Sequence, residues 1–160
     1  MKDFSVYATS VYKIIGAAME VHQILSFGLL EPVYQEALQM ELYLRKIDSK
    51  REQGIDIYYK GQMLTKKYKM DLVVDDIIIE TKSVERLLPE HRAQLFNYLR
   101  LTHKPVGLLI NFGEESLKAE RWIYDEETNR CFLTDKNLQP INKIGLYFLC
   151  GIVFLNINFH

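Results

Sequence analysis

The chain has 160 residues, 48% of them hydrophobic, so it is long enough to bury one core and too short for two ordinary domains. A formal net charge of −1 excludes a broadly basic surface, and any contact with a polyanion must come from a local patch. Two cysteines, Cys131 and Cys150, and the lack of a signal-like start favour a cytoplasmic protein over a disulfide-stabilised secreted one.

A first helix is predicted from about Ser10, because apolar residues recur there at helical spacing. The stripe consists of Val11, Ile14, Ile15, Ala18, His22 and Leu25. A histidine on such a stripe is typical of a core residue that hydrogen-bonds to a neighbour, so we interpret His22 first as structural.

A second helix is predicted from Glu31-Pro32 to about Lys46, since proline suits the first helical position and an acid suits the positive end of the helix dipole. Glu31 shares a face with Tyr34 and Leu38. The carboxylate is therefore either a simple cap or an inward-facing site residue.

The next segment is interpreted as polar over Ser49 to Gln53, followed by a strand over Ile55 to Tyr58 that turns at Lys60-Gly61. The returning arm reaches Asp71 and leads into a three-stranded antiparallel meander. Its basic residues are either a solvated strand face or a short phosphate-binding strip. They are Lys66, Lys67 and Lys69, with Lys60 across the hairpin.

A tight hairpin is predicted where the apolar runs Leu72 to Val74 and Ile77 to Ile79 flank Asp75-Asp76. In that register Asp71 faces Glu80. Directly opposed residues project to the same side of a sheet, where like charges are destabilising.

Two facing carboxylates need a proton or a cation to relieve their repulsion. Lys82 lies two residues beyond Glu80 and projects from the same face. The group is either a cross-strand salt-bridge cluster or a site for a hard metal such as Mg²⁺ or Mn²⁺. A metal beside a fixed cation would suit phosphodiester hydrolysis.

A third helix is predicted from Pro89-Glu90 to near Thr102, with Gln94 and Tyr98 one turn apart on its inward face. The apolar run Val106 to Phe112 then predicts a buried strand parallel to the second arm of the hairpin. The fold class is therefore α/β in the order α-β-β-β-α-β. We expect Leu117 to Tyr124 to cover the sheet edge.

The C-terminal part does not fit this pattern. Ile144 to Leu155 is uncharged and mostly apolar, but shorter than the roughly 18 residues that argue for a membrane helix. We therefore expect a domain over 1–128, an extension of uncertain structure over 129–160, no membrane, and a possible homo-oligomer contact through this tail.

Asp71 and Glu80-Thr81-Lys82 resemble the core of the PD-(D/E)XK nuclease superfamily, in which the lysine follows the second acid by two residues. Gly28 to Tyr34 looks like the G-x-x-E-x-x-Y signature of a family of small, mostly uncharacterised bacterial proteins in that superfamily. Further agreement lies in Ile14 to Ala18, Glu20 to His22, Ala93 to Thr102 and Val106 to Gly113. The resemblance spans about residues 10–123.

This resemblance implies a restriction-endonuclease-like core, a mixed central sheet flanked by helices, and a nuclease acting on DNA more than on RNA. The implied catalytic residues are Asp71, Glu80, Lys82, Gln94 and Glu31. The expected ligands of Mg²⁺ or Mn²⁺ are Asp71, Glu80, Thr81 and Glu31. The expected contacts to nucleic acid are Lys66, Lys67, Lys69 and Tyr98.

The resemblance also adds two alternatives to single residues. Some nucleases of the superfamily use a first-helix histidine as a metal ligand, which is a second role for His22. The Gln94–Tyr98 spacing is similar to a motif of the RecB-like branch, in which the glutamine lies beside the catalytic lysine.

Two other functions compete with the nuclease. A noncatalytic protein-binding or regulatory module that keeps the fold is favoured by the near-neutral charge and the apolar tail, and disfavoured by the full acid–acid–lysine set. A small-molecule phosphoesterase would need a pocket that closes over the site.

Overall fold

A computed structural model describes residues 2–141, 148–149 and 152–153 of the chain. Its helices are η1 (Ser5–Tyr7), α1 (Ala8–Leu25), α2 (Glu31–Leu44) and α3 (Pro89–Thr102). Its strands are β1 (Lys50–Ile55), β2 (Tyr58–Tyr59), β3 (Gln62–Met63), β4 (Tyr68–Val74), β5 (Ile77–Lys82), β6 (Val106–Asn111), β7 (Lys118–Asp125), β8 (Arg130–Leu133), β9 (Phe148–Leu149) and β10 (Ile152–Val153).

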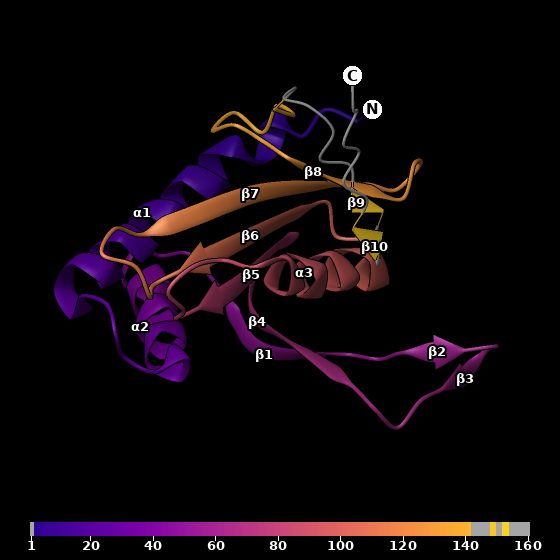
Figure 1. The fold of residues 1–160 in the computed structure, drawn as a ribbon, viewed down its shortest axis with the longest axis horizontal. Coiled ribbons are helices and arrows are strands. Elements are labelled where there is room, and N and C mark those ends of the chain that lie inside the picture. The colour runs from indigo at the N-terminus through magenta and orange to yellow at the C-terminus, as the bar shows by residue number, and fades with distance from the viewer. Residues whose placement is uncertain (1, 142–147, 150–151, 154–160) are drawn as a thin grey trace, which may run out of the picture.

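One mixed sheet organises the fold, with strand order β1-β4-β5-β6-β7-β8-β9-β10 (Figure 1). Strand β6 runs parallel to β5, as the α3 crossover between them requires, and the other neighbouring pairs are antiparallel. The α-β-β-β-α-β core order and the mixed sheet flanked by helices are confirmed.

Alternate residues of β5 pack into two separate cores. Ile77 and Ile79 belong to the core that α1 and α2 form on one face of the sheet. Ile78 belongs to the core that α3 forms on the other face. Because side chains alternate along a strand, Glu80 and Lys82 continue the α3 side. The polar end of β5 is thus directed toward α3.

The predicted hairpin register is confirmed, since Leu72 pairs with Ile79, Val73 with Ile78 and Val74 with Ile77. Asp75 adopts a positive φ of 50° in the turn, a conformation that aspartate tolerates better than most residues. Helix α3 has the predicted bounds, and α1 and α2 lie where apolar periodicity placed them.

The prediction that the first strand begins at Ile55 is wrong. Strand β1 covers Lys50–Ile55 and pairs with β4 at Lys50, Arg51 and Gln53 to Ile55, so it includes part of the segment interpreted as a polar connection. It lies at the edge of the sheet, where most of its side chains reach solvent, so no apolar alternation marked it. The turn at Lys60-Gly61 is present, but it joins β2 and β3 in a separate two-stranded hairpin.

Residues 118–133 do more than cover an edge, because β7 and β8 extend the sheet beyond β6. Strand β8 lies past residue 128 and contains the buried Cys131, so the sheet continues into the part expected to be an extension. Most of the apolar tail expected to form an oligomer contact lies outside the described residues. No helix among the described residues combines the length and apolarity needed to cross a bilayer.

Candidate active site

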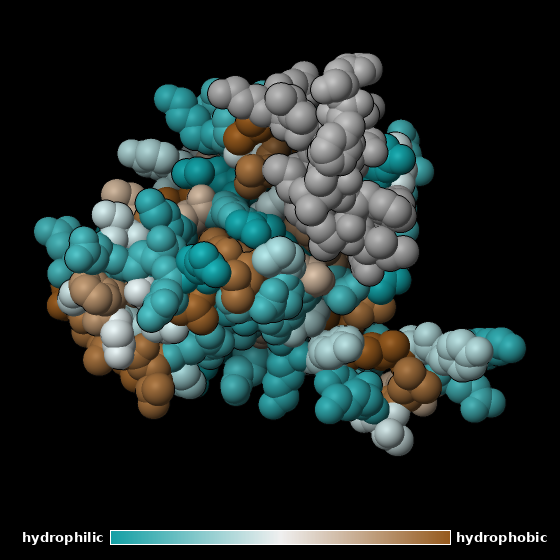
Figure 2. Space-filling model, in the orientation of Figure 1, coloured by the Kyte–Doolittle hydropathy of each residue, from teal (hydrophilic) through white to brown (hydrophobic). Residues whose placement is uncertain are grey.

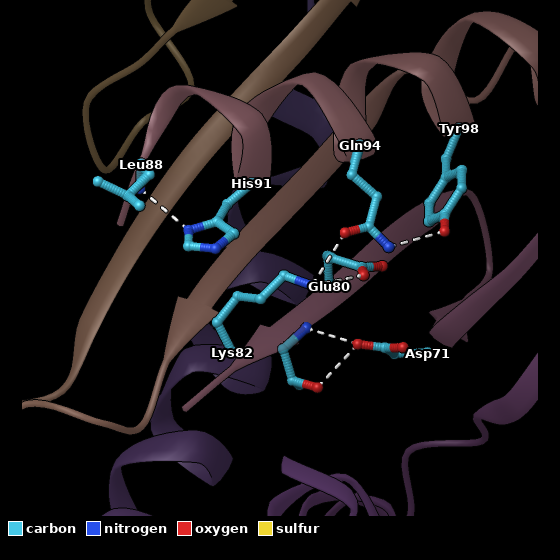
Figure 3. Close-up of polar contacts among 8 residues, drawn as sticks. Asp71, Glu80, Lys82, Leu88, His91, Gln94 and Tyr98 are labelled. Carbon is cyan, nitrogen blue, oxygen red and sulfur yellow. Dashed lines mark hydrogen bonds and ion pairs between the residues drawn. The ribbon is translucent and has the colours of Figure 1, made fainter. Parts of the chain in front are cut away.

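Glu80 and Lys82 lie together at the end of β5, under helix α3 (Figure 3). Glu80 is 1% exposed and Lys82 is 8% exposed. The Lys82 ammonium donates to Glu80 Oε1 over 3.3 Å. A buried charge is costly unless it is paired, so this ammonium depends on the acceptors that surround it.

Gln94 provides the second acceptor for that ammonium, since its Oε1 lies 2.9 Å from Lys82 Nζ. The amide nitrogen of Gln94 donates to the Tyr98 hydroxyl over 2.9 Å, one helical turn further along α3. Because the ammonium can only donate, it requires the amide oxygen of Gln94 to face Lys82, and the Tyr98 hydroxyl accepts from the amide nitrogen at the other end. The structure thus places Gln94 beside Lys82, as the sequence motif suggests.

Asp71 lies on β4 and is bound to Thr81 of the neighbouring strand. Its Oδ2 accepts the Thr81 backbone N–H and the Thr81 hydroxyl, both at 2.8 Å. Regular pairing of the two strands ends one step earlier, at Leu72–Ile79, so the carboxylate replaces a ladder acceptor there. Both hydrogen bonds use Oδ2, and neither uses Oδ1. The Thr81 side chain is fully buried.

Glu80 has the strongest electrostatic perturbation at this site. Burial and, after it, the nearby Asp71 charge raise the pKa of its carboxyl to about 8, against the opposing effect of Lys82. Glu80 Oε2 is buried and has no hydrogen-bond partner among the residues that the structure describes. Native structures rarely leave such an atom unpaired, so Oε2 is a position that a proton or a cation would satisfy.

Glu31 lies at the start of α2, at the margin of the same cluster. Half-burial raises the pKa of its carboxyl, and the neighbouring charges of Lys82 and Asp71 lower and raise it respectively. The backbone of Ser83 also hydrogen-bonds to it and lowers the pKa. Ser83 Oγ donates to Leu29 O over 2.7 Å, which fastens the loop before α2 to the end of β5.

Tyr34 fixes the same loop from inside the core. Its hydroxyl donates to Ser26 O over 2.7 Å and accepts from Leu29 N over 3.2 Å. Its ring stacks on Phe112 with centroids 4.7 Å apart. Gly28 within the loop has a φ of 97°, which a side chain would disfavour. Together these residues set the position from which Glu31 approaches the cluster.

His22 is bound to the backbone in this structure. Its Nε2 lies 2.8 Å from the carbonyl oxygen of Glu114, and its ring lies near that of Phe112. This contact fits the interpretation of His22 as a core histidine.

The four residues predicted to contact nucleic acid differ in their exposure and in their partners. Lys66 and Lys69 are exposed, whereas Lys67 forms a 2.8 Å ion pair with Asp56. Tyr98 is 4% exposed and its hydroxyl is bound to Gln94, so it orients Gln94 and does not present an open ring.

Two residues near the site had no predicted role. His91 Nδ1 accepts the Leu88 N–H over 3.0 Å at the start of α3, which leaves its Nε2 as the protonated nitrogen of a neutral ring. Burial and Lys82 lower its pKa. Asn111, at the end of β6, binds both the N–H and the carbonyl of Val84 and holds the segment that follows Lys82. In the sequence, the only sign of this role is that Asn111 is a polar residue within the apolar run Val106 to Phe112.

The donor set can be compared with what a metal requires. Within the described residues, no three His, Cys, Asp or Glu side chains are grouped as a ready metal cage. Mg²⁺ usually binds one or two carboxylates and keeps several waters. Asp71 together with Glu80 Oε2, which has no partner within the described part of the chain, fits that requirement.

One of the comparisons with known proteins identifies the family of the chain. A search of curated proteins finds no match. The solved structure titled "Crystal structure of SSO0001" is similar to this chain with a TM-score of 0.45 and 22% identity, over 61% of this chain and 52% of that one. The chain thus spans about half the length of that protein. A family model described as the PD-(D/E)XK nuclease superfamily matches residues 8–122, and the chain belongs to that superfamily.

Proposed function

We propose that the protein is a metal-dependent nuclease that hydrolyses phosphodiester bonds of nucleic acid, with DNA as the preferred substrate. The observation that carries the proposal is the pair of buried residues Glu80 and Lys82, with the partly buried Gln94 bound to Lys82 and Asp71 beside them, in a chain of the nuclease superfamily. In a purely structural salt bridge we would expect both oxygens of Glu80 to have partners. Oε2 has none among the described residues, which leaves it available to bind a metal.

Asp71 and Glu80 would hold Mg²⁺ or Mn²⁺, with the backbone of Thr81 between them as a further oxygen donor. Such an ion supplies an activated water and neutralises charge that develops on the phosphate. Glu31, at the margin, would accept a hydrogen bond from a water of the site. Its raised pKa also makes it a candidate to take up a proton.

Lys82 would stabilise charge on the reacting phosphate or orient the attacking water. An ammonium has three donors, and Glu80 and Gln94 accept two of them. The third is left for a water or a phosphate oxygen. Gln94 is a positioning residue, because it acts on the reaction by holding Lys82.

We also place the chain in the G-x-x-E-x-x-Y group of the superfamily. Gly28, Glu31 and Tyr34 have three connected roles that support this assignment. Gly28 permits the loop conformation, Tyr34 anchors that loop, and Glu31 lies beside Lys82 and Asp71. The role of the signature would therefore be to position the Glu31 carboxylate beside the site.

The proposal is tested by incubating the protein with single- and double-stranded DNA and RNA in Mg²⁺ or Mn²⁺, with EDTA as the control. We expect cleavage of DNA that EDTA abolishes and that Lys82→Met removes. A correctly folded wild-type protein that cuts none of the four substrates would favour the noncatalytic module.

A further inference from the structure

The segment 56–69, here called the arm, follows β1, ends with the first two residues of β4, and projects from the body of the protein (Figure 1). It carries the β2–β3 hairpin, and Figure 2 shows apolar side chains exposed on it among hydrophilic ones. Tyr58 and Tyr59 at its tip are 63% and 64% exposed. Exposed aromatic side chains gathered on one projection commonly mark an interaction site.

The two tip tyrosines lie on opposite faces of the hairpin. Tyr58 pairs with Met63 and Tyr59 with Gln62, and directly opposed residues share a face. Each face therefore presents one ring. The Lys60 ammonium lies 5.6 Å from the centroid of the Tyr59 ring, so a cation accompanies the aromatic surface.

The arm also holds a concentration of positive charge. It contains four lysines and one aspartate, a net charge of +3, whereas the whole chain carries −1. Asp56 pairs with Lys67, so the excess charge is on Lys60, Lys66 and Lys69. The arm thus meets the requirement for a local patch that the overall charge imposes on any polyanion ligand.

The root of the arm reaches the candidate active site through a series of contacts. Tyr68 is 42% exposed, and the centroid of its ring lies 5.9 Å from that of Tyr98. Tyr98 binds Gln94, and Gln94 binds Lys82. Tyr68 precedes Asp71 by three residues of β4, about 10 Å along a strand. A ligand lying along the arm would therefore end at the acids and the lysine.

We propose that the arm is a binding platform for single-stranded DNA that guides the strand into the site, an inference that rests on the proposed nuclease function. Open aromatic faces stack on unpaired bases and lysines follow the phosphates, a combination typical of single-strand binding. A duplex keeps its bases stacked inside and offers these rings no partner. Single-stranded DNA is therefore the preferred substrate class in this proposal.

The test measures binding of a fluorescent 20-nucleotide oligo-dT by anisotropy in EDTA, where no cleavage occurs. Wild type is expected to bind it more tightly than a 20-base-pair duplex. The double variant Tyr58→Ala/Tyr59→Ala is expected to lose about tenfold or more in affinity, the scale of losing base stacking. Lys60→Gln is expected to lower the affinity and to reduce the dependence of the affinity on salt concentration.

Matched controls exist on the helices. Tyr12 and Tyr43 are each 79% exposed, so Tyr12→Ala/Tyr43→Ala removes two surface tyrosines away from the arm and is expected to leave binding unchanged. Lys13→Gln is the corresponding charge control, because Lys13 is exposed on α1. Circular dichroism checks that every variant is folded.

The inference is overturned if the arm variants bind oligo-dT as wild type does, if the duplex binds more tightly, or if oligo-rU binds at least tenfold more tightly than oligo-dT. A dimer in sedimentation that the tyrosine variants abolish, without any loss of DNA binding, would assign the arm to contact between copies instead. Cleavage with unaltered KM in the arm variants would leave the nuclease function standing without the platform. Arm-dependent binding without metal-dependent cleavage would leave the platform standing alone.

Discussion

An acid–lysine ion pair lies near each end of strand β5. The two pairs have the same distance between nitrogen and oxygen but differ in their exposure to solvent. Near its start, Lys104 Nζ lies 3.3 Å from Asp76 Oδ1, and near its end Lys82 Nζ lies 3.3 Å from Glu80 Oε1. The Asp76 side chain is 59% exposed and the Glu80 side chain is 1% exposed. Water screens the first pair, whereas the second lies where charges interact strongly and must be satisfied locally. Burial, more than separation, therefore distinguishes a candidate site from a surface ion pair.

The largest effect should come from removing the two lysines separately. Lys82→Met keeps the apolar stem and removes a preorganised charge, so we expect DNA cleavage to fall about 100-fold or more. Folding and Mn²⁺ binding should survive. Lys104→Met removes the lysine of the exposed pair and should leave cleavage within experimental error. Initial rates under saturating Mn²⁺ compare the two variants, and equal losses would contradict the assignment.

A second contrast separates Glu31 from His22. Glu31→Gln should lower metal-dependent cleavage about tenfold or more, as expected for an outer-shell group of a metal site, with little change in melting temperature. His22→Ala breaks the contact to the Glu114 backbone and should mainly lower the melting temperature. Cleavage assays and thermal melts of both variants check this. The reverse pattern would make His22 the ligand.

The third expectation concerns the pH dependence of stability without metal. Glu80 has a pKa of about 8 in the folded protein and about 4.5 when unfolded, so the folded state holds the proton between these values. The stability from this group is fully present below about pH 4.5 and is lost as pH rises through about 8. Melting temperatures in EDTA should therefore fall across this window.

Glu80→Gln cannot lose a proton and should flatten that dependence. Asp76→Asn, at the exposed pair, should retain the wild-type slope. A wild-type melting temperature that is constant or rises over the window would show that Glu80 is ionised in the folded protein.

The smallest effect should come from the exposed pair itself. A double-mutant cycle of Asp76→Asn and Lys104→Met should give a coupling free energy of about 0–1 kcal/mol, as surface ion pairs do. Urea unfolding of the four proteins measures it. A coupling well above that range would mean that exposure does not explain the difference between the two pairs.

The sequence predicts the parts of this molecule that local patterns encode. Continuous apolar runs on both sides of Asp75-Asp76 set the hairpin register, and helical spacing placed Gln94 and Tyr98 on one inward face. The approach of Gln94 to Lys82 came from a family motif, because no local pattern reports contact between a helix and a strand.

Other features depend on tertiary packing and left no such pattern. Strand β1 is a strand because β4 pairs with it, although its own residues are largely polar. The bidentate contact of Asn111 with Val84 exists only because the loop after β5 passes close by, so close that a Cβ on Gly113 would collide with the Val84 backbone. The raised pKa of Glu80 likewise follows from burial beneath α3.

The central claim is that Glu80 Oε2 is a metal ligand. It is tested most directly by soaking crystals in Mn²⁺ and measuring anomalous scattering. The account predicts a peak in contact with both Glu80 Oε2 and the Asp71 carboxylate, with Lys82 still bound to Gln94. Manganese bound only elsewhere on the protein, with Glu80 Oε2 still without a partner, would contradict it.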